Sequence, residues 1–316
     1  MKNITGFTIS QDDLKFCGIN LNKPTCIVKL NDQELLCTDT EYGIIKINWK
    51  NNTQKPYLQK NQYTPGEQLN SFMLSGPDTI LLANMAKGRI EIIKDSQDKQ
   101  TLFDKVNNKP LGRVNFICSD NKNGFYATVS TNKDLTFEGL SSKVTDGYIV
   151  HFTLDTIKLV AKNLKFPNEA RIDSKGEYLY VAETAGKCVS RFKILDKGNL
   201  GEKELFGPQD FGPGGYPDGI QFDKHGNLWG TLVFGEKIYC LSKGQDLQII
   251  YDASNKSAIK KVDSAFNSNY ITPEIGLSAA NKINPFIVSV TFAGPDNNLA
   301  FIGSYGNKLS YFKCSV

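Results

Sequence analysis

Four polar residues stand at or just before the start of apolar, strand-like runs. They are Thr25, Asn115, Asn168 and Asp218. Together they offer hydroxyl, amide and carboxylate oxygens, with no His or Cys among them. An oxygen-only set of this kind suits a hard or borderline divalent cation, Ca²⁺ first, with Mg²⁺, Mn²⁺ or Zn²⁺ as alternatives. Asn and Asp also form turns before strands, so a purely structural role is the competing interpretation.

The elements that carry two of these residues are alike. Around Asn168, residues 166–181 read as a loop, a strand, an Asp-Ser-Lys-Gly turn and a second strand. About fifty residues later, residues 216–231 repeat this order around Asp218, with an Asp-Lys-His-Gly turn. Short apolar runs separated by turn residues of this type predict antiparallel hairpins.

Similar units recur along the whole chain. Six of them, at a period of about 45 to 55 residues, read as up-and-down sets of short strands, and none shows a convincing helical apolar stripe. The sequence therefore predicts an all-β, six-bladed β-propeller formed as one domain from residues 1–316. A double-sheet sandwich is the second choice, but it would not explain six similar units. The first three predicted strands of each unit are 24–28, 35–39 and 43–47; 71–74, 80–83 and 88–93; 114–118, 125–129 and 147–152; 167–172, 178–181 and 189–194; 217–222, 228–231 and 237–241; 287–292, 299–302 and 309–312.

Two stretches depart from the repeat. We expect an insertion near 133–146, as a surface loop close to a site, and another near 242–285 between the last two units. Within the second, Ala279–Lys282 reads as a short helix or a loop. Ahead of the first unit, four apolar residues are candidates for an edge strand: Phe7, Ile9, Leu14 and Phe16.

Composition narrows the class of protein. The chain has 316 residues, 40% of them hydrophobic, and a formal charge of only +4 without a long basic block, so neither nucleic acid nor a membrane is expected as a partner. Met1–Gln11 lacks the apolar core of a signal peptide. The seven widely spaced cysteines read as buried free thiols rather than a disulfide framework or a zinc site. We expect a cytoplasmic protein of undetermined oligomeric state.

In a propeller, the first strand of each blade lines the central channel. A polar side chain at its entrance therefore points towards the common axis, and residues far apart in sequence converge there. This geometry would bring Thr25, Asn115, Asn168 and Asp218 around one cation.

Several of these segments resemble the senescence marker protein/gluconolactonase/regucalcin-like family. The resemblance is carried by Phe166–Glu169 with the strand Tyr178–Thr184, by Tyr216–Gly219 with Asn227–Trp229, and by Asn115 with Tyr126–Thr131. It covers most of the chain from about Lys23 onwards. The resemblance implies a six-bladed propeller that holds one divalent metal in the axial channel and, where active, hydrolyses lactones or related esters.

The resemblance also implies roles for single residues. Asn115 and Asn168 match the neutral metal ligands of the family, and Asp218 matches the ligand that doubles as the catalytic acid and base. One position departs, because the family usually has an acidic ligand near Pro24, where this chain has Asn22 or Thr25 depending on register. Glu169 is a candidate to compensate, although strand alternation would point it to the opposite face.

The mechanism that follows is metal-assisted hydrolysis. The cation would polarise a lactone carbonyl, and Asp218 would activate a water and then protonate the leaving alcohol. Arg113, Glu169 and Tyr216 are candidate substrate contacts. Arg113 also fits a surface charge, and Tyr216 fits core packing. A serine–histidine hydrolase is disfavoured, because neither histidine lies near a Gly-x-Ser-x-Gly motif.

Two functions remain open from the sequence. The first is a metal-dependent hydrolase of small lactones, with a small lactone or ester as its partner. The second is a catalytically impaired propeller that binds a metal or another ligand. The missing acidic residue favours the second, and Asn115, Asn168 and Asp218 favour the first.

Overall fold

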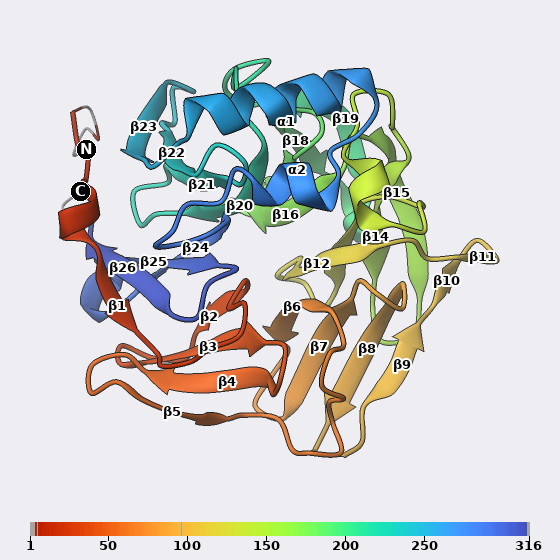
Figure 1. Cartoon of the computed structure of the whole chain (residues 1–316). Coiled ribbons are helices and arrows are strands. Elements are labelled where there is room, and N and C mark those ends of the chain that lie inside the picture. The colour runs from red at the N-terminus through yellow and green to blue at the C-terminus, as the bar shows by residue number, and fades with distance from the viewer. Residues whose placement is uncertain (1–3, 5, 96, 315–316) are drawn as a thin grey trace.

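The computed structural model describes residues 4, 6–95 and 97–314. Within these residues the chain forms six four-stranded antiparallel sheets arranged around a central axis, which Figure 1 shows with the first strand of each sheet innermost. The predicted six-bladed β-propeller is therefore confirmed. No helix in the described part of the chain is long and apolar enough to cross a membrane.

Each blade is built from neighbouring strands of the sequence, except that the last blade takes its outer strand from the N-terminal segment. From the inner to the outer strand, the blades are as follows: blade 1, β2 (Ile27–Lys29), β3 (Glu34–Asp39), β4 (Gly43–Asn48) and β5 (Thr53–Pro56); blade 2, β6 (Leu69–Leu74), β7 (Thr79–Asn84), β8 (Arg89–Lys94) and β9 (Gln100–Phe103); blade 3, β12 (Val114–Ser119), β13 (Phe125–Val129), β14 (Gly147–Phe152) and β15 (Ile157–Leu164); blade 4, β16 (Pro167–Ile172), β17 (Tyr178–Glu183), β18 (Cys188–Ile194) and β19 (Leu200–Leu205); blade 5, β20 (Pro217–Phe222), β21 (Leu228–Leu232), β22 (Lys237–Leu241) and β23 (Leu247–Asp252); blade 6, β24 (Ile287–Ala293), β25 (Leu299–Ser304), β26 (Leu309–Lys313) and β1 (Lys15–Cys17).

The second strands are apolar because neighbouring blades cover both of their faces. All five residues of β13 are buried, as are all five of β21. The outer strand β5 is exposed along its whole length, and its polar sequence Thr-Gln-Lys-Pro matches that position. Outer strands therefore carry little apolar signal, which explains why the sequence indicated only three strands in each unit.

The two similar turns form as the sequence predicts. In blade 4 the Asp173 carboxylate accepts a hydrogen bond from the backbone N–H of Glu177, at 2.9 Å. In blade 5 the Asp223 carboxylate accepts from the N–H groups of His225 and Asn227, at 2.8 and 2.9 Å. An aspartate that binds the following backbone in this way closes a tight turn, so the Asp in each copy has a structural role.

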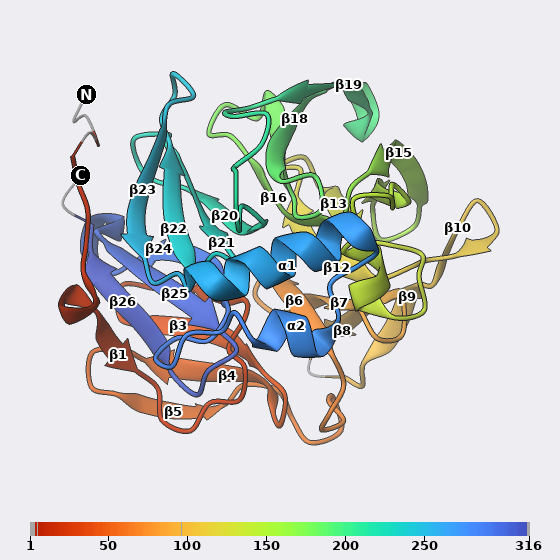
Figure 2. The same cartoon turned by 45° about the horizontal axis from the view of Figure 1, so that its top comes forward.

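A helical segment joins blades 5 and 6. It consists of α1 (Lys256–Ser268) and α2 (Pro273–Leu277), which both views place across one face of the propeller (Figures 1 and 2). Strand β23 lies inside the range 242–285, so the irregular part begins only after Asp252. Residues Ala279–Lys282 form turn and loop, with no helix.

Helix α1 corrects the expectation that the chain contains no helical apolar stripe. The side chain of Asn255 caps it by accepting from the N–H groups of Ser257 and Ala258. The buried positions form one stripe of the helix among polar residues, which makes the periodicity faint over only 13 residues. These buried residues are Ala258, Ile259, Val262 and Phe266.

Short elements complete the chain. A two-stranded hairpin, β10 (Lys105–Val106) with β11 (Lys109–Pro110), lies between blades 2 and 3. The described 3₁₀ helices are Gln11–Asp13, Thr136–Gly139, Asp196–Gly198 and Pro295–Asn297. The predicted edge strand near the N-terminus is β1, which includes Phe16 and pairs with β26.

Candidate active site

The pairing register places one residue of every blade at an equivalent point of its inner strand. In blades 2 to 6 the register of the inner and second strands shifts at this point, so a β-bulge turns the residue out of the regular ladder. In blade 1 the equivalent residue lies just before β2, where Thr38 holds the N–H groups of Thr25 and Cys26. In blade order, the ring consists of Thr25, Asn70, Asn115, Asn168, Asp218 and Val288.

The predicted metal ligands Asn115, Asn168 and Asp218 are thus brought to matching positions on three consecutive inner strands, β12, β16 and β20. Asn70 had escaped the sequence analysis. Its signal was the same as that of the others, a polar residue at the start of a strand, but the predicted strand began only at Ser71, whereas β6 begins at Leu69. In the structure Asn70 Nδ2 donates a hydrogen bond to Asn115 Oδ1, at 2.5 Å.

Two hydroxyl groups fix the orientation of the ring amides. Asn115 Nδ2 donates to Ser130 Oγ at 2.9 Å, and Ser130 Oγ donates in turn to the Pro167 carbonyl at 2.8 Å. Asn168 Nδ2 donates to Thr184 Oγ1 at 3.2 Å, and that hydroxyl donates to the Pro217 carbonyl at 2.7 Å.

A hydroxyl that has given its only proton to a carbonyl can only accept from the amide. Each Asn must therefore turn its nitrogen towards the hydroxyl, which leaves Oδ1 of Asn115 and Asn168 on the other side of the amide. Each hydroxyl also connects its own blade to the next one, because the carbonyl that it binds belongs to the residue just before the next ring residue. The positions of the ring residues therefore depend on contacts between blades.

The carboxyl group of Asp218 has no compensating partner among the described residues. Protein surrounds its carboxyl group, yet part of the side chain remains accessible, as expected for a residue that lines a channel. Among the described residues, none donates a hydrogen bond to this carboxylate or forms an ion pair with it. Burial, and then the negative charge of Glu169, raise the pKa of Asp218 well above its usual value. A positive charge bound beside the carboxylate would oppose both effects and lower the pKa of Asp218.

Glu169 lies on the inner side of its strand, against the expectation from strand alternation, because the bulge in β16 interrupts that alternation. It is 5% exposed, and one carboxylate oxygen accepts from the Ile220 N–H at 3.2 Å and pairs with the Arg171 guanidinium at 2.8 Å. Burial raises the pKa of Glu169 to about 7, although the charge of Arg171 opposes the shift. Arg171 also stacks over the Phe116 ring at 4.2 Å, so the pair bridges blades 3, 4 and 5.

The other two predicted substrate contacts, Tyr216 and Arg113, bind other parts of the protein. Tyr216 is fully buried, its hydroxyl donates to Asp263 of α1 at 2.7 Å, and its ring packs against Phe234 and Phe266. These contacts match the alternative interpretation of Tyr216 as a core residue. The Arg113 guanidinium donates to the carbonyls of Met85, Ala86 and Lys133, which ties the blade 2 loop to the blade 3 insertion.

The two insertions meet over the face on which the ring lies. The Ile271 N–H donates to the Leu140 carbonyl at 3.1 Å, and Lys143 Nζ donates to the Ser268 carbonyl at 3.1 Å. Figure 2 shows α1 and α2 lying across the inner strands of several blades. We call this cover the roof, defined as residues 133–146 together with 253–286. A shared apolar cluster packs it onto blades 4 to 6, and the cluster includes the ring residue Val288.

Tyr305 stands beside the ring at the end of β25. Its side chain is 45% exposed, which shows that it borders an open space. The surrounding protein, and then the charge of Asp218, raise the pKa of Tyr305 to about 12. Lys23, from the loop before blade 1, places its amine 5.6 Å from the Tyr305 ring centre. Both residues border the side of the ring next to blade 1.

The donor set fits a divalent cation of the Ca²⁺ type. Two oriented amide oxygens and one carboxylate without a partner are hard oxygen ligands. No three side chains of His, Cys, Asp or Glu gather in the described part of the chain, so the candidate centre depends on amides as well as acids. Thr25 adds only a neutral hydroxyl, which lies 3.0 Å from Thr38 Oγ1, and Asn22 is exposed in the preceding loop.

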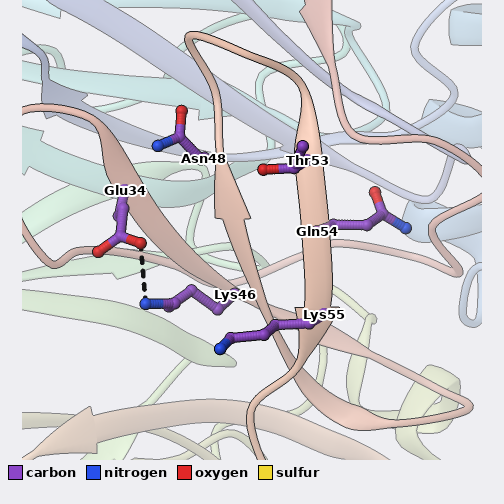
Figure 3. A pocket seen from close by; sticks show the side chains of 6 residues that line it. All are labelled: Glu34, Lys46, Asn48, Thr53, Gln54 and Lys55. Carbon is purple, nitrogen blue, oxygen red and sulfur yellow. Dashed lines mark ion pairs between the residues drawn. The ribbon is translucent and has the colours of Figure 1, made fainter.

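A hollow of about 280 Å³ on the outer strands of blade 1 is unrelated to this ring. Figure 3 shows its lining, in which Glu34 and Lys46 form an ion pair at 2.8 Å beside Asn48 and Lys55. None of the lining residues belongs to an inner strand.

Residues 24–259, well over half of the chain, match the SMP-30/Gluconolactonase/LRE-like region. The chain belongs to the SMP-30/gluconolactonase/LRE-like family. The resemblance noted in the sequence is thereby confirmed. No curated protein sequence gives a significant match.

Solved structures with the fold of this SMP-30/gluconolactonase/LRE-like protein include three at low identity. A putative gluconolactonase has a TM-score of 0.67 at 12% identity, covering 95% of this chain and 92% of its own. A luciferin-regenerating enzyme has a TM-score of 0.66 at 13% identity, covering 93% and 92%. A gluconolactonase from Xanthomonas campestris has a TM-score of 0.63 at 15% identity, covering 94% and 87%. These likenesses establish the shared fold.

Proposed function

We propose that this protein is a hydrolase of small lactones that works with one divalent cation, Ca²⁺ first, at the ring of inner strands. One observation carries the proposal: three oxygen donors lie on consecutive inner strands, and the only acid among them, Asp218, has no hydrogen-bond or ion-pair partner among the described residues. Membership of the family and the gluconolactonases among proteins of the same fold support the choice of a lactone as substrate.

Asn115 Oδ1, Asn168 Oδ1 and the Asp218 carboxylate would hold the cation. When bound, it would supply Lewis-acid polarisation of the substrate carbonyl. Asp218 is the group placed to take a proton from the attacking water and return it to the leaving alkoxide, because it is the only acid of the ring and no described residue binds its carboxylate. Glu169 and Arg171 fix the wall beneath Asp218, since they bind the backbone and side chains of β20.

The roof defines how a substrate would reach the ring. Apolar side chains pack it on blades 4 to 6, and Thr136 contacts Met85 of the blade 2 loop, so we infer that a lactone approaches from the side of blade 1, past Lys23 and Tyr305. The ring of Tyr305 and the ammonium of Lys23 offer an apolar face and a charge to a polyhydroxylated lactone. Arg113 binds backbone carbonyls, and we assign it to holding the roof rather than to substrate contact.

The test is turnover of a panel of aldono- and aliphatic lactones by protein first stripped with a chelator and then reloaded with Ca²⁺, Mg²⁺, Mn²⁺ or Zn²⁺. The Asp218→Asn variant keeps the shape of the side chain and removes its charge. We expect its kcat to fall by at least about 10². Asp78→Asn, at an exposed turn of blade 2, is the matched control and should behave as wild type.

A second function has one observation in its favour, the neutral Thr25 at the ring position of blade 1. Fewer acidic ligands weaken cation binding, so the ring could hold a ligand without turning it over. Saturable cation binding with no hydrolysis of any lactone under any metal would replace the hydrolase with this binding module. Unchanged turnover in Asp218→Asn would remove the proposed catalytic role of that residue.

A further inference from the structure

A larger cavity, of about 570 Å³, lies between blades 3 and 4. Its walls come from the β12–β13 turn, the β14–β15 turn and the β18–β19 connection. The first turn joins an inner to a second strand, and the other two join third to outer strands. All three lie at the strand ends away from the ring, so the cavity opens on the rim opposite the roof. It shares no residue with the candidate active site.

A buried His–Asp pair forms the floor of this cavity. His151 is 7% exposed and Asp120 is 8% exposed, and His151 Nε2 lies 2.8 Å from Asp120 Oδ2. The other oxygen, Asp120 Oδ1, accepts from the N–H groups of Lys122 and Gly124 at 2.7 and 2.8 Å. Burial by itself would raise the pKa of Asp120, but these three hydrogen bonds lower it below its usual value. Asp120 is therefore ionised and can only accept, so His151 Nε2 carries the proton and donates it to Asp120 Oδ2 in this hydrogen bond.

The imidazole ring is held in one orientation. A Cβ atom at Gly124 would come within 2.5 Å of the ring, and one at Gly198 within 2.3 Å, so backbone packs closely against it from two elements. The Tyr126 ring meets it edge-on at 5.0 Å. With Nε2 committed to Asp120, Nδ1 is the remaining ring nitrogen. None of the described residues forms a hydrogen bond with it, and it is not sealed from solvent.

Positive charge gathers around the same cavity. Lys122, Lys158 and Lys197 line it, and none of the three pairs with a carboxylate in the described part of the chain. Lys158 Nζ donates to the Lys197 carbonyl at 2.7 Å and to Asn199 Oδ1 at 2.8 Å. Both acceptors are neutral, so they hold the ammonium in place without cancelling its charge. The carboxylates of Asp120 and Asp196 also line the cavity and offset two of the three charges, so one positive charge remains in excess.

We propose that this cavity binds a small phosphate-bearing molecule. Ammonium groups and an imidazole nitrogen that becomes a donor on protonation are typical partners of phosphate oxygens. The hydroxyls of Thr153 and Thr156 share a hydrogen bond of 3.1 Å at the cavity wall, which leaves one hydroxyl proton of the pair for a ligand. The volume falls within the range of small-molecule sites and exceeds what a bare phosphate fills, so a phosphorylated compound of sugar size fits.

The chain contains two histidines, which makes a direct readout possible. Imidazole resonances of ¹⁵N-labelled full-length protein can be followed while glucose 6-phosphate is added, with inorganic phosphate and gluconate in parallel titrations. His151 should shift saturably with glucose 6-phosphate and less with phosphate alone. His225, in the β20–β21 turn of blade 5, serves as the internal reference and should not move.

Matched variants test the part played by the fixed ammonium. Lys158→Met should weaken the binding of glucose 6-phosphate by about tenfold or more, the loss of one charge-assisted contact. Lys175→Met, at an exposed turn of blade 4, should leave it unchanged. His151→Gln keeps a donor for Asp120 and should abolish saturable binding of glucose 6-phosphate. An unaltered thermal unfolding curve would show that the fold of this variant is intact.

Three results would overturn the site. The first is a His151 resonance that does not move, or that moves together with His225. The second is equal affinity in the Lys158→Met and Lys175→Met proteins. The third is a response to gluconate but not to glucose 6-phosphate, which would reject phosphate as the ligand class. All of these readouts are independent of lactone turnover.

Discussion

At the scale of single residues, the ring shows how neutral amide side chains are held with their oxygens in one direction. Asn115 and Asn168 are each held through Nδ2 by a hydroxyl whose own proton is committed elsewhere. The amides cannot exchange oxygen for nitrogen without placing two acceptors, the amide oxygen and the hydroxyl oxygen, face to face. Preorganisation of this kind reduces the ordering cost of ligand binding, which matters most in a site with few charges.

Thr25 is the position where one substitution should change the site most. By register it is equivalent to Asp218, and its side chain contacts Thr38 across the strand pair. Thr25→Asp would add a second carboxylate to the ring, and each added acidic ligand raises affinity for a divalent cation. We expect Ca²⁺ to bind at least about tenfold tighter, as measured by calorimetry on chelator-treated protein.

Thr25→Asn provides the neutral comparison, because it adds an amide like those of Asn115 and Asn168 without adding charge. An affinity gain that is equal in the Asp and Asn variants would show that shape rather than charge limits the ring. No gain in either variant would mean that blade 1 does not face the cation.

At the scale of elements, the roof is anchored at its C-terminal end by a buried acid. Glu236 is fully buried and accepts from the Phe286 N–H at 2.8 Å, the Ile287 N–H at 3.4 Å and Asn281 Nδ2 at 2.6 Å. It thereby joins blade 5 to the segment that leads from the roof into β24. Burial raises the pKa of Glu236 from its ordinary value of 4.5 to about 7, although the hydrogen bonds oppose this rise.

This shift gives folding a definite pH dependence. Between pH 4.5 and 7 the unfolded chain loses the Glu236 proton while the folded chain keeps it, so stability falls as pH rises through this window. The slope approaches about 1.4 kcal/mol per pH unit for one group. Glu236→Gln cannot ionise, so its free energy of unfolding should fall less steeply with pH, although Glu169 still titrates in the same range.

Urea unfolding of apo protein at several pH values between 4.5 and 8 measures this difference. The exposed Glu41→Gln variant is the control and should retain the wild-type slope. Parallel curves for wild type and Glu236→Gln would show that Glu236 is already ionised in the folded protein across the whole window.

The elements also show which parts of the structure the sequence could predict. Inner and second strands were found because their apolar runs are short and bounded by turns, as in Tyr178–Val181. The outer strands and α1 were missed, since exposed strands such as β5 are polar and α1 buries only a narrow stripe. Within the site, Asn115, Asn168 and Asp218 were found by position. The inward turn of Glu169 could not be predicted, because a bulge leaves no mark on strand alternation.

At the scale of the whole molecule, the propeller is a ring that must close on itself. Strand β1 completes blade 6 by pairing with β26, with Lys15 opposite Tyr311 and Cys17 opposite Leu309. Cys17 is also buried in a cluster with Ile27 of blade 1 and Leu309 of blade 6. The N-terminal segment therefore joins the last blade to the first, and the contact that closes the ring is the one with the greatest sequence separation.

Because the ring closes through β1, a short N-terminal deletion should destabilise the whole propeller. Removing residues 1–17 takes away the β1 ladder and the buried side chains of Leu14 and Cys17, and it exposes the edge of β26. We expect the free energy of unfolding to fall by about 2 kcal/mol or more from the lost apolar burial, and the protein to associate through the new edge. Chemical unfolding and size-exclusion chromatography measure the two effects.

A Lys15→Ala/Phe16→Ala variant alters only exposed side chains and keeps the backbone pairing of β1. It should therefore elute from the size-exclusion column at the same volume as wild type. Wild-type stability in the truncated chain would show that blades 6 and 1 hold together without the strand, and that closure of the ring does not depend on β1.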